Sequence, residues 1–281
     1  MKEIIFTKLT GAGNDFILID SELNSDISIS PSLIKKLCDR RFGIGADGLL
    51  VISDDLETDF QMKYFNSDGT SGMLCGNGAR CIIKYAEHTG RIKDSQTKFV
   101  FQSERFSGNV IDKNTIKFDL NPPSQIKENI VVNILGKSFN AAFIDNGAHH
   151  VIIDLAKQSF DSEDLQDIEQ FPVEKYGRAI RYSDQFAPLG TNVNFIQHEK
   201  EIIKIRTYER GVEQETLACG TGAVASALTS VLSGEGSAPI TLRTKSNELL
   251  MVDFNVSPTN EIENVSLTGP AKIVFKGKIK I

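Results

Sequence analysis

An internal duplication constrains this chain more than any other feature of its sequence. The segment C-G-N-G-A at residues 75–79 returns as C-G-T-G-A at residues 219–223, an offset of 219 − 75 = 144 residues. The same offset relates Tyr64 to Tyr208, each at the end of a predicted strand. A weaker similarity, at an offset of 147 − 13 = 134, relates residues 13–20 to residues 147–154. Both halves have the same order of strand, cysteine and helix, so we expect a duplicated domain.

Short runs rich in Ile, Val, Phe and Thr are separated by turn residues, a pattern typical of antiparallel β architecture. Four helices are expected: one opening at Ser30-Pro31, one from Gly76 to about His88, one over Ser162–Gln170 and one from Gly220 to about Leu232. The expected fold class is therefore α/β (α+β), with few helices. The predicted strands are Ile4–Lys8, Phe16–Asp20, Leu49–Ile52, Phe60–Phe65, Lys98–Gln102, Thr115–Leu120, Ile130–Leu135, His150–Asp154, Asn194–Gln197, Ile202–Tyr208, Ile240–Arg243 and Leu250–Phe254.

The segment Asn121-Pro122-Pro123 is the expected boundary between the halves. Consecutive prolines interrupt both helices and strand ladders. The prediction is an N-terminal half over residues 1–121 that carries Cys75, and a C-terminal half over residues 122–268 that carries Cys219.

Composition excludes several classes of function. The net charge is −6 with no basic cluster, which argues against nucleic acid or an anionic membrane surface as the main partner. Four cysteines in 281 residues are no disulfide framework. The N-terminal residues do not resemble a secretory signal, and the apolar runs are too short to span a bilayer. We therefore expect a cytoplasmic protein whose thiols stay reduced.

Cys75 and Cys219 each stand just before a glycine-rich helix start. Free backbone N–H groups and the helix dipole favour a thiolate at such a place and can also bind a carboxylate. Two such cysteines at equivalent places suggest a reaction that is itself nearly symmetric. In a racemisation or epimerisation, a thiolate removes the α-proton from one face of the carbon and a thiol supplies a proton to the other.

Several motifs in a fixed order then identify a resemblance. Over nearly its whole length the sequence resembles the diaminopimelate epimerases, pyridoxal-independent enzymes of lysine and peptidoglycan precursor synthesis. The resemblance implies two pseudo-symmetric domains, each with antiparallel strands wrapped around a central helix, an active site in the cleft between them, and a C-terminal strand, 269–281, that returns to the first domain. The motifs are K-L-T-G-A-G-N-D-F, D-R-R-F-G-I-G-A-D-G, Y-F-N-S-D-G, C-G-N-G-A-R-C, T-N-V-N-F, Y-E-R-G-V and E-T-L-A-C-G-T-G.

The resemblance also implies a role for individual residues. Cys75 and Cys219 would be the catalytic acid/base pair, and Glu209 would pair with the ammonium at the reacting carbon. The carboxylate at the reacting carbon would be bound by Gly76, Asn77, Gly220 and Thr221. The distal amino-acid end of the substrate would be held by Asn14, Asn66, Asn192 and Arg210.

Two positions depart from the family pattern. Gly48 stands where the family often has Gln, so one distal contact is expected to be lost or replaced by water. The family has a His preceded by Pro near the middle of the chain, whereas this chain has Asn-Gly-Ala-His-His at residues 146–150. Aligning the glycine assigns that histidine to His150, the preferred match, and a shift of one residue assigns it to His149.

No cofactor and no metal are expected. Residues 43–48 match G-x-G-x-x-G literally, but a predicted helix precedes them and a predicted strand follows, the reverse of a dinucleotide-binding motif. Cys75 and Cys81 do not have zinc-ligand spacing, and Cys38 and Cys81 are expected in the core. The expected partner is a small-molecule substrate, and a homodimer is left open. Alternatives are another amino-acid racemase or isomerase of the same fold, a thiol redox-switch protein, or a non-catalytic amino-acid-binding protein.

Overall fold

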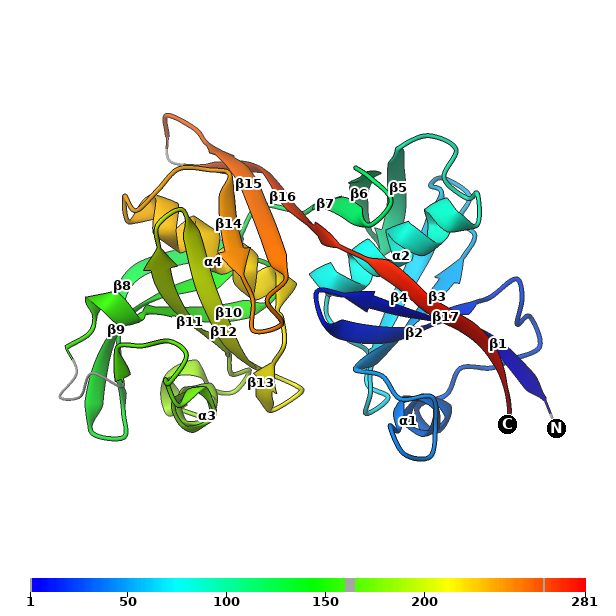
Figure 1. Ribbon diagram of the computed structural model, residues 1–281, viewed down its shortest axis with the longest axis horizontal. Coiled ribbons are helices and arrows are strands. Elements are labelled where there is room, and N and C mark those ends of the chain that lie inside the picture. The colour runs from blue at the N-terminus through cyan, green and yellow to red at the C-terminus, as the bar shows by residue number, and fades with distance from the viewer. Residues whose placement is uncertain (1, 160–164, 260) are drawn as a thin grey trace. The chain divides into compact units, whose positions relative to one another are not determined.

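The computed structural model describes residues 2–159, 165–259 and 261–281 (Figure 1). The chain folds into two compact units. The first contains Met1–Leu120 together with Thr268–Ile281, and the second contains Asn121–Leu267. Each unit combines many strands with few helices, so the predicted α/β (α+β) class is confirmed. In the part of the chain that is described, no helix has the length and apolar character needed to cross a bilayer.

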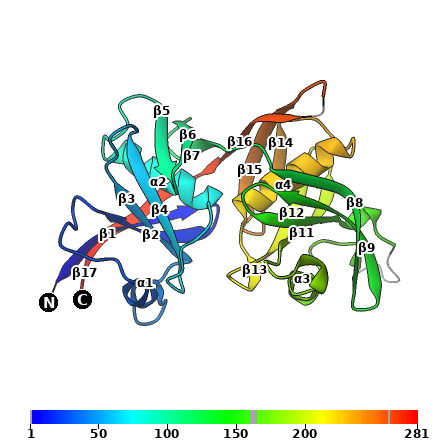
Figure 2. The ribbon, with the colours of Figure 1, turned by 180° about the vertical axis from the view of Figure 1, so that it is seen from behind.

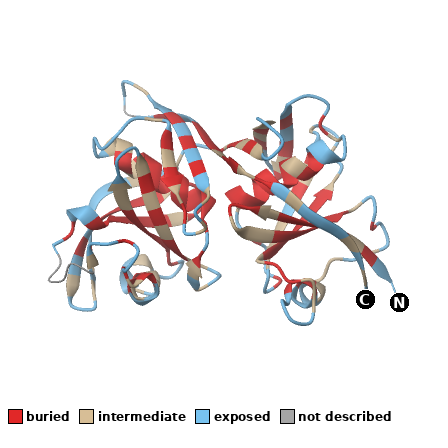
Figure 3. Cartoon of the chain, viewed as in Figure 1, coloured by how far each residue is buried: buried red, intermediate tan, exposed pale blue. Residues whose placement is uncertain are grey.

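A buried helix, α2 (Gly76–His88), forms the centre of the first unit, and strands surround it in both views (Figures 1 and 2). Ten of its residues are buried, including Ala79, Ile82, Ile83 and Ala86 (Figure 3). The shorter helix α1 (Pro31–Cys38) begins at the predicted Ser30, whose side chain accepts from the N–H of Leu33. The strands are β1 (Glu3–Gly11), β2 (Asn14–Asp20), β3 (Gly48–Ser53), β4 (Phe60–Asn66), β5 (Gln96–Phe101), β6 (Glu104–Val110), β7 (Thr115–Asp119) and β17 (Lys272–Lys280).

The second unit is built in the same way around α4 (Gly220–Leu232), whose apolar residues are buried almost throughout its length. Its other α-helix is α3 (Val173–Arg181). Its strands are β8 (Gln125–Ile134), β9 (Lys137–Asp145), β10 (His149–Asp154), β11 (Asn192–Glu199), β12 (Ile202–Glu209), β13 (Gln214–Thr216), β14 (Ile240–Arg243) and β15 (Leu249–Val256), with β16 (Ile262–Pro270) running on into the first unit's segment.

The connections repeat from one unit to the other. In the first, β2 pairs in parallel with β3 across α1, and β4 pairs in parallel with β5 across α2. In the second, β10 pairs in parallel with β11 across α3, and β12 pairs in parallel with β14 across α4. A parallel pair needs a long crossover, which these helices supply. The expectation of antiparallel strands holds for pairs such as β1 with β17, β3 with β4 and β8 with β9.

Three of the four predicted helices match the structure, including α1 at Ser30-Pro31, and the fourth is wrong over its described residues. Helices α2 and α4 have the expected bounds. Residues 160–164 of the predicted helix Ser162–Gln170 lie outside the described residues, and residues 165–170 form turns instead of an α-helix. Helix α3, which was not predicted, begins after Pro172 and contains Gly177. A Cβ at Gly177 would lie 2.4 Å from the Cβ of Tyr208, so close packing on β12 explains a glycine inside this helix.

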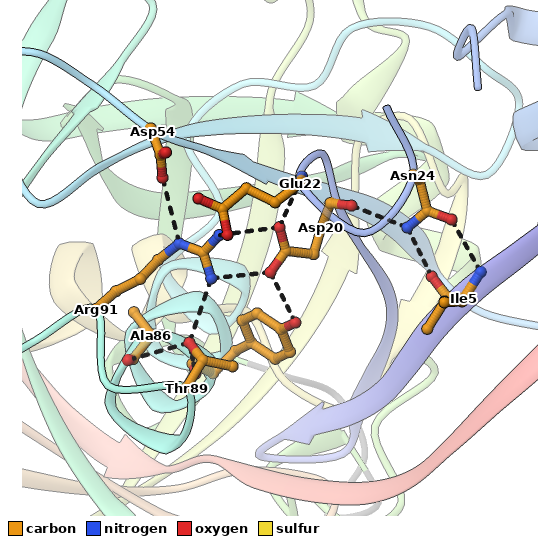
Figure 4. Close-up of polar contacts among 9 residues, drawn as sticks. Ile5, Asp20, Glu22, Asn24, Asp54, Ala86, Thr89 and Arg91 are labelled. Atoms are coloured by element: carbon orange, nitrogen blue, oxygen red, sulfur yellow. Dashed lines mark hydrogen bonds and ion pairs between the residues drawn. The ribbon is translucent and has the colours of Figure 1, made fainter. Parts of the chain in front are cut away.

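A buried carboxylate ties the end of α2 to β2. Asp20 accepts a hydrogen bond from the Tyr85 hydroxyl at 2.9 Å and two from the Arg91 guanidinium, at 2.8 and 3.0 Å (Figure 4). A bidentate pair of this kind fixes the relative orientation of the guanidinium and the carboxylate as well as their separation. It holds the C-terminal end of α2 in place, at the opposite end from Cys75.

Candidate active site

Cys75 is the N-cap residue of α2. Its Sγ accepts a hydrogen bond from the N–H of Gly78 at 3.4 Å, which satisfies one of the donors that a helix start leaves free. The cysteine is partly exposed, whereas the other three residues of the first turn are buried. The sulfur therefore stands at the positive end of a helix dipole, on the surface of the first unit.

Cys219 has the same local geometry in the second unit. It is the N-cap residue of α4, and its Sγ accepts from the N–H of Gly222 at 3.4 Å. It is 8% exposed, and its sulfur lies 3.6 Å from the Oγ1 of Thr221. The duplication seen in the sequence thus extends to the hydrogen bond that each sulfur receives.

A chain of amide hydrogen bonds lies beside Cys75 in the first unit. The Nδ2 of Asn77 donates to the Oδ1 of Asn14 at 2.6 Å, and the Nδ2 of Asn14 donates to Asp47 at 3.0 Å. The structure therefore brings Asn14 and Asn77 together. Asn66 lies two strands away, at the end of β4, where its Nδ2 donates to Thr70 at 3.0 Å. Gly76 is buried in the first turn of α2.

Gly48, the departure from the family pattern, lies opposite Asn66 in the pairing of β3 with β4. A Cβ at this position would lie 2.5 Å from the Cε2 of Tyr64 and 3.0 Å from its hydroxyl oxygen. The Tyr64 ring also packs edge-on against Phe16. Tyr64 thus fills the space in which a side chain at position 48 would begin, so a Gln here would require the Tyr64 ring to move.

In the second unit a hydrogen-bonded series leads to Cys219. The Nδ2 of Asn194 donates to the Nδ1 of His150 at 3.2 Å and to the carbonyl oxygen of Val151 at 3.1 Å, while its Oδ1 accepts from Thr207. Since Nδ1 accepts, the Nε2 of His150 carries the proton and donates to the Oγ1 of Thr221 at 3.0 Å. The Thr221 hydroxyl hydrogen is then available to the sulfur of Cys219.

The two histidines of the ambiguous match have different surroundings. His150 is fully buried, and burial lowers its pKa to about 3, helped by the positive charge of Arg210. The ring is therefore neutral at ordinary pH. His149 is partly exposed, and its Nδ1 lies 3.2 Å from the carbonyl oxygen of Gly190. Of the two, His150 is the one in contact with Thr221.

The remaining predicted residues of the second unit gather at the ends of β11 and β12. The Oδ1 of Asn192 accepts from the N–H of Arg210 at 2.9 Å, and its Nδ2 donates to the carbonyl oxygen of His149. Glu209 accepts from the hydroxyl of Thr216 at 2.9 Å. Burial lowers the pKa of the Arg210 guanidinium, helped by the positive charge of Arg181. Gly220 is buried at the start of α4.

Three polar residues next to these sites were not assigned roles from the sequence. Arg80 is fully buried and donates to Asn77 at 2.7 Å. Asn194 orients His150, and Asn146 donates to the carbonyl oxygen of Thr221 at 2.9 Å. Arg80 and Asn194 both lie inside motifs that carried the resemblance, which is the signal that could have pointed to them.

One group of side chains outside the cysteine sites has metal-ligand chemistry. Ligand atoms of Asp154, His198 and Glu235 lie within 4.8 Å of one another. The ammonium of Lys157 lies 3.0 Å from Glu235 and 4.0 Å from Asp154. Lysine thus already supplies a positive charge to both carboxylates.

Comparison with known proteins decides the family. The model of the family described as diaminopimelate epimerase matches residues 6–126 and 158–274. The diaminopimelate epimerase of Aquifex aeolicus is 38% identical over 98% of this chain and 97% of its own length. That of Flavobacterium psychrophilum is 39% identical over 97% of this chain and 98% of its own. The chain belongs to the diaminopimelate epimerase family. It is therefore an isomerase that acts on a small molecule, as the sequence predicted.

Solved structures of more distant proteins show the same fold. A phenazine biosynthesis protein of the PhzF family from Bacillus anthracis superposes with a TM-score of 0.74 at 13% identity, over 100% of both chains. A probable proline racemase from Agrobacterium radiobacter superposes with a TM-score of 0.71 at 11% identity, over 99% of this chain and 92% of the other. At such low sequence identity these superpositions show only that this chain and the two proteins share a fold.

Proposed function

We propose that this chain interconverts LL-2,6-diaminopimelate and its meso form, without pyridoxal phosphate or a metal, in the cytoplasmic synthesis of lysine and peptidoglycan precursors. The observation that carries the proposal is the matched pair of N-cap cysteines. Each sulfur accepts a 3.4 Å hydrogen bond from the N–H three residues later, in a family whose named members are diaminopimelate epimerases.

In this proposal Cys75 and Cys219 act on opposite faces of one α-carbon. The thiolate of one takes the α-proton and becomes a thiol, and the electron pair of the broken C–H bond moves into the carboxylate. The thiol of the other gives its proton to the opposite face and becomes a thiolate. One proton leaves and one arrives, so the configuration inverts and the two cysteines exchange charge. The reverse reaction uses the same groups.

Both halves of the chain would contribute substrate-binding residues. We propose an N-terminal half, 1–121 with 269–281, that contributes Cys75, and a C-terminal half, 122–268, that contributes Cys219. The reacting carboxylate would be bound at the two helix starts, whose free N–H groups favour the charge that develops there. This uses Gly76, Asn77, Gly220 and Thr221, with His150 supporting Thr221.

A second set of residues would select a substrate with two amino-acid ends. Arg210 offers a guanidinium to the distal carboxylate, and Glu209 a carboxylate to the ammonium at the reacting carbon. Asn14, Asn66 and Asn192 complete this set with amide groups that can accept from an ammonium or donate to a carboxylate.

The test is incubation of the reduced protein with stereochemically pure LL-diaminopimelate and chiral analysis of the product. The buffer contains chelator and no pyridoxal phosphate. Appearance of the meso form supports the proposal. No inversion of LL-diaminopimelate, together with racemisation of proline or of another amino acid, would replace it with another isomerase activity of the same fold.

A further inference from the structure

Arg80, on the second turn of α2, is a buried cation with an unusual set of partners. It is the largest fully buried side chain among the described residues, with 0% exposure. Its Nη1 donates to the carbonyl oxygen of Gly76 at 3.2 Å, and its Nη2 donates to the Oδ1 of Asn77 at 2.7 Å. Its Nε has no hydrogen-bond partner. In residues 2–159, 165–259 and 261–281, no carboxylate lies within ion-pair distance of this guanidinium.

An uncompensated charge in the interior is costly, and such a cost usually marks a function. Burial lowers the pKa of Arg80 to about 10, which leaves the side chain charged at neutral pH. Both of its acceptors belong to the residues directly after Cys75, so the charge lies behind the helix start that carries the sulfur.

Two thiols flank this guanidinium: Cys75 directly precedes Gly76, whose carbonyl oxygen Arg80 binds, and Cys81 directly follows Arg80. Burial lowers the pKa of Arg80, and the negative charges that Cys81 and Cys75 can carry act in the opposite direction. Cys81 is fully buried, and desolvation raises the pKa of its thiol, so it stays protonated. Cys75 is partly exposed and can hold a negative charge. The anion that would compensate Arg80 is thus the thiolate of Cys75.

Several other charged groups on the elements around α2 already have partners. Asp15 on β2 pairs with Lys8 on β1 and with Arg40, which also pairs with Asp47. At the far end of α2, Arg91 pairs with Asp20 and Glu22. On β7 and β17 the pairs are Lys117 with Asp119 and Lys276 with His88, and on α2 itself Lys84 pairs with Glu87.

At the equivalent position the second unit carries an uncharged side chain. At the offset of 144 residues, 80 + 144 gives position 224, which is the buried Val224. Beside Cys219 stands the neutral hydroxyl of Thr221, 3.6 Å from the sulfur. In a low-dielectric interior a full charge stabilises an anion more than a long neutral hydrogen bond does.

We propose that Arg80 is a positioning residue that holds Cys75 as a thiolate in the free protein, and that Cys75 is therefore the more acidic thiol of the pair. The assignment of Cys75 as the resting base rests on the proposed function. The acidity itself does not, because it belongs to the protein without substrate. An epimer whose α-hydrogen meets Cys75 would react at once, whereas the other epimer would first need a proton to pass from Cys219 to Cys75 through solvent.

The test is thiol alkylation without substrate. Reduced protein is pulsed with iodoacetamide across a pH series, and peptide mass spectrometry gives a pH midpoint for each cysteine. In the wild type the midpoint of Cys75 should lie about one pH unit or more below that of Cys219. Arg80→Met should raise the Cys75 midpoint by about one unit or more, a tenfold loss of thiolate, and leave Cys219 unchanged. Arg80→Lys, which keeps the charge, should restore most of the shift.

Arg105→Met is the matched control, since Arg105 is an exposed arginine of the same unit, and it should move neither midpoint. Coincident wild-type midpoints, or a lower midpoint for Cys219, would overturn the proposal. So would a native Arg80→Met protein with an unmoved Cys75 midpoint. The comparison of Cys75 with Cys219 in the wild type needs no variant, so it tests the proposal even if Arg80→Met does not fold. If the protein inverts diaminopimelate but the two midpoints coincide, the proposed function stands and only the role of Arg80 is rejected.

Discussion

The Nε2 of His150 lies 3.0 Å from the Oγ1 of Thr221, across 71 residues of sequence. The contact links β10 to the first turn of α4, next to Cys219. Because Asn194 donates to the other ring nitrogen, the direction of this hydrogen bond is fixed. Thr221 is thereby oriented by a buried neutral imidazole, and its hydroxyl hydrogen is left for the sulfur.

Thr221→Val should lower both activity and stability. Valine keeps the shape but removes the acceptor of His150, so a buried N–H is left without a partner. This should cost about 1–3 kcal/mol in the free energy of unfolding, measured by urea titration. Turnover should fall about tenfold or more, because Cys219 loses its hydroxyl neighbour. Thr229→Val on the same helix is the control, since Thr229 donates only to the backbone of Ala225. Equal effects of the two variants would contradict this role of Thr221.

His150 should make stability depend on pH. Its pKa in the folded protein is about 3, below the ordinary 6.5, so the unfolded chain binds a proton more readily. The stabilisation is complete above pH 6.5 and is lost as pH falls toward 3, by at most about 1.4 kcal/mol per pH unit. Urea unfolding at pH 7 and pH 5 should show a smaller decrease for His150→Gln than for wild type. His88→Gln, at an exposed histidine, should behave as wild type. An unchanged decrease in His150→Gln would show that other groups cause it.

The sequence predicted the elements that local chemistry determines. Cys75 and Cys219 were expected just before helices because apolar residues recur at helical spacing after the glycines that follow them, and both are N-caps. Helix α3 could not be predicted in this way. It has no side-chain cap, and its Gly177 is explained only by contact with Tyr208, which is distant in sequence.

Contacts between residues distant in sequence could not be predicted for the site either. Asn14 and Asn77 could be selected by motif, but their mutual hydrogen bond depends on how β2 meets α2. The burial of Arg80 and the filling of the Gly48 position by Tyr64 are properties of packing that periodicity does not reveal. The parallel pairs were missed for a related reason. Short β-rich runs look alike in sequence whether a turn or a helix connects them.

Oxidation should inactivate the protein reversibly if the two cysteines act on one carbon. Two thiols that both reach one carbon atom are near enough to each other to form a disulfide after small rearrangements. Peroxide treatment should therefore remove activity and two titratable thiols together, and a dithiol should restore both. Cys38 and Cys81 are buried and serve as internal controls that stay reduced. Full activity with both reactive thiols still present after peroxide would contradict this arrangement.

The single variants Cys75→Ala and Cys219→Ala test the proposed mechanism most directly. Inversion needs an acceptor on one face and a donor on the other, so each variant should lose turnover by about 10²–10⁴-fold or more. Substrate binding should survive better, because the carboxylate contacts come from backbone N–H groups and the distal contacts from Asn14, Asn66, Asn192 and Arg210. Cys38→Ala is the matched control and should retain activity.

The two variants should also differ in which epimer they still exchange, a difference that a general loss of structure would not produce. Each keeps the thiol that meets the α-hydrogen of only one epimer. In D₂O, residual exchange without inversion should therefore favour LL substrate in one variant and meso substrate in the other. The wild type should place deuterium in product faster than in recovered substrate, because thiols on opposite faces do not share one proton. Nuclear magnetic resonance of the α-position measures both rates. Full epimerase activity in either variant would exclude the two-base mechanism, since one remaining thiol cannot serve both faces of the carbon.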